Sequence, residues 1–141
     1  MSKTILITGA SSGFGRDTAE TLALEGHRVF ATLRDIDGRN RTHADALRAK
    51  GIHVEQLDVT SDVSVAQGVK AVLAQAGRLD VVINNAGTAV LDVSEAFTTN
   101  QVRDLYEVNV FGVHRVLARH CLRCASRGKG SLSTSAPRWV A

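Results

Sequence analysis

Cysteine, proline and aromatic residues are scarce in this 141-residue sequence, which has two cysteines, one proline and 4% aromatic residues. Cys121 and Cys124 form a single C-x-x-C pair, and no second pair of cysteines or histidines completes a zinc ligand set. We therefore expect two ordinary thiols and no metal site. No apolar run is long enough to cross a bilayer, and the N-terminus lacks the apolar stretch of a signal peptide. These absences predict a soluble, cytoplasmic protein with no membrane partner.

Acidic residues are absent from the last part of the chain. All 14 of them, but only 11 of the 17 lysines and arginines, lie in residues 1–107, which gives a net charge of −3 there and +6 in residues 108–141. A basic segment can bind nucleic acid through phosphates, but these arginines match no known reading motif. We expect no nucleic-acid partner. The length and the 44% hydrophobic content predict one globular domain with a substantial core.

Short apolar runs alternate with helical patterns along most of the chain. Four apolar, β-branched runs predict buried strands, at residues 3–8, 28–33, 52–59 and 79–87. Helical patterns predict helices at residues 16–26, 43–51, 61–77 and 98–120. Ser61 or Asp62 is placed to cap the third helix. This alternation predicts an α/β fold whose doubly wound parallel sheet is covered by helices on both faces.

Three glycines join the first predicted strand to the first predicted helix, in the loop "GASSGFG" over residues 9–15. Glycine permits a tight turn and lets a phosphate approach the backbone, while free N–H groups and the positive end of the helix attract it. A glycine cluster alone is typical of many turns. Its place after the first strand of a βαβ pattern indicates a dinucleotide-binding loop.

Four motifs resemble the short-chain dehydrogenase/reductase family in type and order. They are the T-G-x-x-x-G-x-G loop at residues 8–15, "LDV" with Asp58 and Val59, "NNAG" at residues 84–87, and Asn109 in "YEVNVFG". The resemblance implies a Rossmann-like fold. It covers the first half of a typical member, so we expect a truncated domain over residues 1–118. It also implies that Asp58 and Val59 contact the adenine and that NNAG packs against the adenosine ribose.

Asn109 has two interpretations. The resemblance implies a catalytic role, in which it helps to hold the water of a proton relay. Without the family, Asn109 shares an apolar helical stripe with Leu105, Val113 and Val116. There a structural asparagine with a satisfied side chain is the alternative.

The resemblance implies that the cofactor is a nicotinamide dinucleotide, held by Gly9, Ser11, Ser12, Gly13, Phe14, Gly15, Arg34, Asp58, Val59, Asn85, Ala86 and Gly87. An acidic residue at the end of the second strand would bind the free 2′-hydroxyl of NAD. The sequence has Arg34 there, and a guanidinium suits the 2′-phosphate of NADP. NADP is therefore the expected cofactor. NAD stays possible, because Asp35 is adjacent and Ser12 stands where many NADP-using relatives carry lysine or arginine.

The family's catalytic tyrosine and lysine, written Y-x-x-x-K, are missing. The only tyrosine, Tyr106, is followed four residues later by Val110. The stretch "GSLSTSA" aligns with the family's fifth strand and would make Ser135 the catalytic serine, although "SLSTS" lacks the apolar character of a central parallel strand. We expect the 141-residue chain to be inactive.

The tail over residues 119–141 differs in composition from the part before it. Suppose that the codons from His120 onward are read in the shifted frame that begins at the third base of each codon. In that frame the bases of Cys121 contribute to a leucine codon. The same reading of residues 134–140 permits the string "ISSALGR", which is similar to what the family carries after its fifth strand. We hypothesise that the basic tail is a frame-shifted translation product. A genuinely short protein is the alternative.

These observations predict an oxidoreductase that moves a hydride between NADP(H) and a carbonyl or secondary alcohol. The alternative is a non-catalytic nucleotide-binding or interaction fragment. An intact relative is expected to act on a small-molecule substrate and to form a homo-oligomer.

Overall fold

Four parallel strands form the sheet of the computed structural model, which describes residues 1–90 and 96–124. The strands are β1 (Thr4–Thr8), β2 (Arg28–Leu33), β3 (His53–Gln56) and β4 (Val81–Ile83). Their order across the sheet is β3-β2-β1-β4. β1 pairs with β2 along its whole length, from Thr4 opposite Arg28 to Thr8 opposite Thr32. The two strands with the most continuous apolar sequence therefore lie at the centre.

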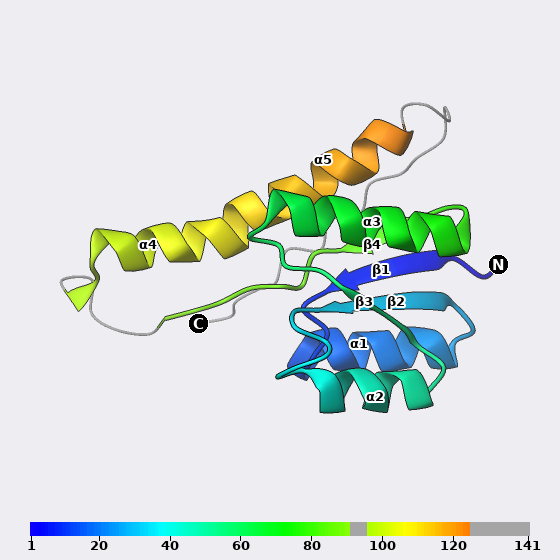
Figure 1. The fold of residues 1–141 in the computed structure, drawn as a ribbon. Helices are drawn as coiled ribbons and strands as arrows, with labels where there is room; N and C mark the ends of the chain where they lie inside the picture. Colours follow the sequence, from blue (N-terminus) through cyan, green and yellow to red (C-terminus); the bar gives the residue numbers. More distant parts are fainter. Residues whose placement is uncertain (91–95, 125–141) are drawn as a thin grey trace.

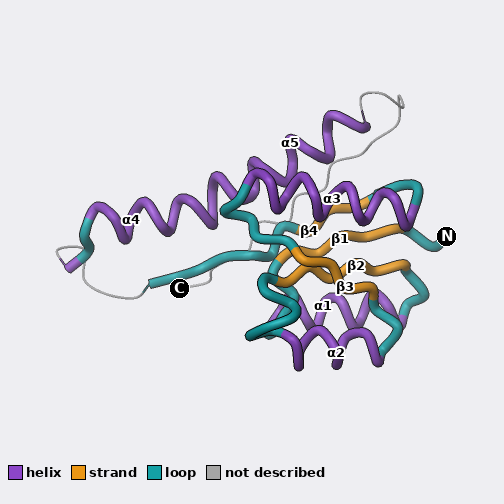
Figure 2. The backbone as a smooth tube through the Cα atoms, viewed as in Figure 1, coloured by secondary structure: helices purple, strands orange, loops and turns teal. Residues whose placement is uncertain are grey.

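Helices cover both faces of this sheet (Figure 1). α1 (Gly13–Leu24) and α2 (Arg41–Ala49) lie on one face. α3 (Asp62–Ala76) lies on the other, beside a long C-terminal helical segment. Figure 2 shows the same layering, with the strands between the two sets of helices. The predicted doubly wound α/β fold is confirmed.

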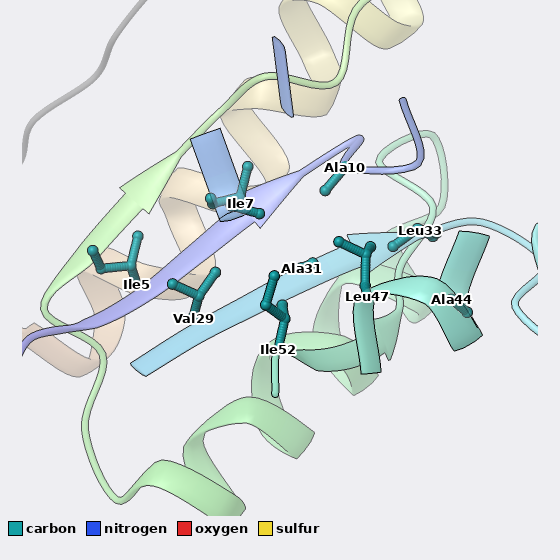
Figure 3. Close-up of a cluster of buried hydrophobic side chains, with 10 residues drawn as sticks. Ile5, Ile7, Ala10, Val29, Ala31, Leu33, Ala44, Leu47 and Ile52 are labelled. Carbon is teal, nitrogen blue, oxygen red and sulfur yellow. The ribbon is translucent and has the colours of Figure 1, made fainter. Parts of the chain in front are cut away.

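Two apolar clusters hold the layers together. Figure 3 shows the cluster under α1 and α2, which contains Ile5, Ile7, Ala10, Ala19, Val29, Ala31, Leu33, Ala44, Leu47 and Ile52. The opposite cluster contains Leu6, Phe30, Leu57, Val59, Val65, Val69, Val72, Leu79, Val82 and Val116. Successive side chains of a strand point to opposite faces. Both faces of β1 and β2 are thus buried, which explains why apolar side chains follow one another directly in each strand.

Local signals placed several element ends correctly. β2 spans the predicted residues 28–33. The Ser61 side chain caps α3 by accepting a hydrogen bond from the Ser64 N–H at 3.2 Å, as predicted. The third strand is shorter than predicted, because the chain leaves the sheet after Gln56 and residues 57–61 form a loop.

The long C-terminal helical segment is not one regular α-helix. It consists of α4 (Thr99–Tyr106), the π-helical turn η2 (Glu107–Gly112) and α5 (Val113–Cys124). A Cβ on Gly112 would lie 2.9 Å from a side-chain carbon of Val59, so glycine permits this turn to contact the loop after β3. The prediction of a continuous helix over residues 98–120 is wrong at η2. The π turn interrupts the expected stripe, and Asn109 is exposed.

α5 continues to Cys124, across the expected boundary after residue 118. The rest of the expected tail, with Ser135, lies outside the described residues. Within the described ranges, no helix is both long and apolar enough to cross a membrane.

Candidate dinucleotide-binding site

The carboxyl ends of the four strands meet at one edge of the sheet, and the loops that follow them border a cavity of about 490 Å³. Ligands of open parallel sheets bind in the crevice outside these ends. Ten of the twelve predicted cofactor-binding residues line the cavity: Gly9, Ser11, Ser12, Phe14, Arg34, Asp58, Val59, Asn85, Ala86 and Gly87. The other two, Gly13 and Gly15, lie in the first turn of α1. The fold therefore brings the predicted set together.

Two glycines of the first loop are required by close packing. Gly9 has a φ of 67°, which favours glycine, and a Cβ there would lie 2.7 Å from the Ala86 Cα. A Cβ on Gly15 would lie 2.6 Å from the Gly9 carbonyl oxygen and would also overlap the Asn85 side chain. The loop after β1 thus packs directly on the loop after β4.

Asn85 and Thr8 join these two loops by hydrogen bonds. The Asn85 side-chain amide donates to the carbonyl oxygens of Thr8 at 3.1 Å and Gly9 at 3.0 Å. The Thr8 hydroxyl accepts from the backbone N–H groups of Asn85 at 3.1 Å and Ala86 at 3.0 Å. Neighbouring Asn84 is buried, and its side-chain amide has no hydrogen-bond partner in the described part of the chain.

The glycine-rich loop presents unused backbone donors to the cavity. Ser11 and Ser12 line it, and within residues 1–90 and 96–124 neither N–H group forms a hydrogen bond. Ser12 is the N-cap of α1 but makes no side-chain capping bond. The first N–H groups of an α-helix have no intrahelical partner and carry a partial positive charge. This end of the cavity suits an anionic group.

Arg34 and Asp58 stand on neighbouring strand ends of the same cavity. Arg34 follows β2 directly, and Asp58 lies in the loop after β3. Burial acts to raise the pKa of Asp58, but hydrogen bonds from Thr60 and the charges of Arg34 and Arg115 outweigh it. The pKa of Asp58 therefore lies below its ordinary value, and this carboxylate is ionised at neutral pH.

Asn109 binds the backbone of the residue after the NNAG motif. Its side chain accepts a hydrogen bond from the Thr88 N–H at 2.9 Å and donates one to the Thr88 carbonyl oxygen at 2.7 Å. Thr88 lines the cavity. Asn109 thus has a satisfied side chain and also connects η2 to the site. The second predicted catalytic residue, Ser135, lies outside the described residues.

Nine cavity residues were not singled out from the sequence: Thr32, Leu33, Arg39, Asn40, Leu57, Thr60, Thr88, Asp104 and Val108. Most of them end a strand or follow one, so the rule that ligands bind beyond the carboxyl ends would have found them. Arg39 and Asp104 gave no such signal. In the part of the chain that the structure describes, no cluster of three or more metal-ligating side chains is present.

The comparisons with known proteins identify one family. The family model described as short chain dehydrogenase matches residues 3–132. The 3-ketodihydrosphingosine reductase of Bacteroides thetaiotaomicron is 37% identical over 127 residues, which cover 89% of this chain and 44% of that protein.

Solved structures agree with this match. A short-chain dehydrogenase from Streptomyces avermitilis has a TM-score of 0.83 and 36% identity, over 95% of this chain and 49% of its own. A variant of actinorhodin polyketide ketoreductase, solved with NADPH, has a TM-score of 0.83 and 33% identity, over 94% of this chain and 52% of its own. The chain thus spans about half the length of the proteins it matches.

Proposed function

Because the chain belongs to the short-chain dehydrogenase family, we propose that its cavity binds NADP(H). We propose further that it is the cofactor-binding part of an oxidoreductase acting on a carbonyl or secondary alcohol. The main support for this proposal is the cavity at the carboxyl ends of the strands. The glycine-rich loop borders it at the end of β1, and Arg34 borders it at the end of β2. The NADPH in the similar polyketide ketoreductase structure supports this choice of cofactor.

The residues of the site fit a dinucleotide. The unused N–H groups of Ser11 and Ser12 suit a pyrophosphate. Gly9 and Gly15 keep this loop close to the strand ends, since a Cβ on either would displace it. Arg34 supplies a positive charge at the end of β2 for a phosphate on the ribose.

The bound cofactor would supply or accept the hydride. The role of this chain is to bind and orient the dinucleotide. Asn109 would hold the loop after β4 in place through both of its bonds to Thr88.

Tyr106 is not suited to proton transfer to a substrate in this cavity. It is half exposed and lines a different, apolar cavity together with Val102 and Phe111. Four residues later the chain has Val110 instead of a lysine that would lower the tyrosine pKa. We therefore propose that the 141-residue chain binds NADPH without oxidising it. This makes a non-catalytic nucleotide-binding module the second candidate function.

Fluorescence titration of NADPH and NADH with the purified 141-residue chain tests the proposal. We expect binding of both, with higher affinity for NADPH. A parallel assay of NADPH consumption with simple aldehydes and ketones separates the two functions, and we expect no turnover. Absence of binding to either cofactor would contradict the proposed site, and steady turnover would contradict the proposed lack of catalysis.

A further inference from the structure

A tight turn over residues 35–40 joins β2 to α2 and borders the dinucleotide cavity. Arg39 and Asn40 line the cavity together with Arg34, the residue just before the turn. Asp35 lies between these lining residues in the sequence but does not line the cavity. In the sequence, Asp35 was the alternative residue that could bind the ribose hydroxyl of NAD. No pattern indicated that Arg39 takes part in the site.

The carboxylate of Asp35 is engaged inside its own turn. It accepts a hydrogen bond from the backbone N–H of Arg39 at 2.9 Å. The Asp35 carbonyl oxygen accepts from the N–H groups of Gly38 at 3.3 Å and Asn40 at 3.1 Å. A Cβ on Gly38 would lie 2.7 Å from Asp35 Oδ2, so only glycine leaves room for the carboxylate. These bonds hold Arg39 at the edge of the cavity.

The backbone conformation of the turn also holds Arg39 at the edge of the cavity. Asp35 has a φ of 47°, which makes it the one non-glycine residue with positive φ in the described part of the chain. This conformation is uncommon outside glycine, asparagine and aspartate. The Asn40 side chain donates to the Arg34 carbonyl oxygen at 2.6 Å and closes the turn from the other end. Arg34 and Arg39 therefore line the same cavity although four residues separate them.

Neither of these two arginines forms an ion pair with a residue that the structure describes. In the described residues, Arg16, Arg41, Arg48, Arg78 and Arg115 all form salt bridges. Arg34 and Arg39 form no salt bridge within residues 1–90 and 96–124.

The cavity also holds two carboxylates. Asp58 accepts hydrogen bonds from the Thr60 N–H at 2.9 Å and the Thr60 hydroxyl at 2.7 Å, and Asp104 lies on α4. Neither forms a salt bridge with Arg34 or Arg39 in the described part of the chain. Both guanidinium groups stay available to an anionic ligand.

We propose that Arg34 and Arg39 together bind the 2′-phosphate of the dinucleotide, and that Asp35 is a positioning residue for Arg39. This inference rests on the proposed function of the cavity. A phosphate monoester carries a charge of about −1.5 to −2 at neutral pH and has three acceptor oxygens. One guanidinium balances about half of that charge, and two balance it. The selection of NADP(H) over NAD(H) is thus shared by two residues.

Adenosine 2′,5′-bisphosphate and adenosine 5′-monophosphate isolate the contribution of the 2′-phosphate. We would measure their dissociation constants by calorimetry for the 141-residue chain and for the variants Arg34→Gln, Arg39→Gln and the double variant. The preference for the bisphosphate should fall about 5-fold in each single variant and disappear in the double variant. Arg41→Gln is the matched control, because this substitution removes the same charge. Arg41 lies on α2, pairs with Asp45 and does not line the cavity. The control substitution should leave the preference unchanged.

Two Asp35 variants test its positioning role. Asp35→Asn keeps an acceptor for the Arg39 N–H and tolerates positive φ, so it should keep the preference for the bisphosphate. Asp35→Ala removes the acceptor and should reduce the preference as Arg39→Gln does, with affinity for the monophosphate unchanged. Circular dichroism checks that each variant remains folded.

The possible failures are distinguishable. If Arg39→Gln keeps the full preference while Arg34→Gln loses it, the second arginine is wrong and the proposed function stands. If Asp35→Asn weakens binding of the monophosphate, Asp35 binds the ribose and its positioning role is wrong. If neither nucleotide nor NADPH binds to the wild-type chain, the proposed function and this inference both fail.

Discussion

Gly15→Ala is the sharpest test of how the glycine-rich loop is held. Gly15 is buried in the first turn of α1, where its Cα faces the Gly9 carbonyl oxygen and the Asn85 side-chain amide. A Cβ would lie 2.6 Å from that oxygen, closer than real Cβ contacts allow, and would overlap the amide. The two loops that border the cavity would have to separate.

Two opposing contributions decide the sign of the change in stability. Alanine is favoured over glycine inside a helix by about 0.5–1 kcal/mol. Overpacking costs about 1–3 kcal/mol. Displacement of Asn85 loses its hydrogen bonds to the carbonyl oxygens of Thr8 and Gly9, at about 0.5–1.5 kcal/mol each. The steric and hydrogen-bond losses exceed the helical gain, so we expect the free energy of unfolding to fall by about 1–5.5 kcal/mol.

Urea unfolding followed by circular dichroism measures this loss, and fluorescence titration measures NADPH affinity. Gly26→Ala is the control, because Gly26 has a φ of 82° with open space around its Cβ position and lies at the far end of α1. It should cost about 1–2 kcal/mol through backbone strain alone and leave NADPH binding unchanged. Gly15→Ala should lose both stability and binding. A Gly15→Ala chain as stable as the wild type, with unchanged NADPH affinity, would refute the packing described here.

Three further predictions concern other parts of the chain. Arg34→Leu should weaken NADPH binding by about 1–2 kcal/mol and leave NADH nearly unchanged, since an exposed charged hydrogen bond is lost; equal losses in parallel titrations would remove its role. Asn109→Ala should lower NADPH affinity and cost about 1–2 kcal/mol of unfolding free energy, because both backbone groups of Thr88 lose a partner; an unchanged affinity would contradict its connection to the site. Burial lowers the pKa of His120 below 6.5, so the stability it contributes is complete above that pH and decreases as the pH falls through the lowered pKa. His120→Gln should flatten the loss of unfolding free energy between about pH 7.5 and pH 5.5. A slope as steep as that of the wild-type chain would contradict the assignment.

The order of the elements follows from the sequence alone. An apolar strand followed by an amphipathic helix determines a parallel sheet covered on both faces, because each element must bury its own apolar side. Local chemistry also determined some boundaries, such as the Ser61 cap of α3, since a cap needs only neighbours in the chain. The position of the glycine-rich loop after β1 predicted which edge of the sheet carries the cavity.

The tertiary structure decided what depends on contacts between distant residues. Periodicity indicated one helix over residues 98–120, but the chain has a π turn where Gly112 packs on Val59, more than fifty residues away in the sequence. Asn85 fell within the predicted strand at residues 79–87, and only folding brings it against Gly9 and Gly15.

Arg39 shows the limit of sequence patterns most clearly. It lies in a mostly polar loop, between Gly38 and Asn40, and no spacing rule distinguishes it from Arg41. The place of Arg39 at the cavity depends on the positive φ of Asp35. It also depends on the Asp35 carboxylate, which accepts a hydrogen bond from the Arg39 N–H. A backbone conformation determines the direction in which a loop side chain extends, and amino-acid order alone did not specify that conformation.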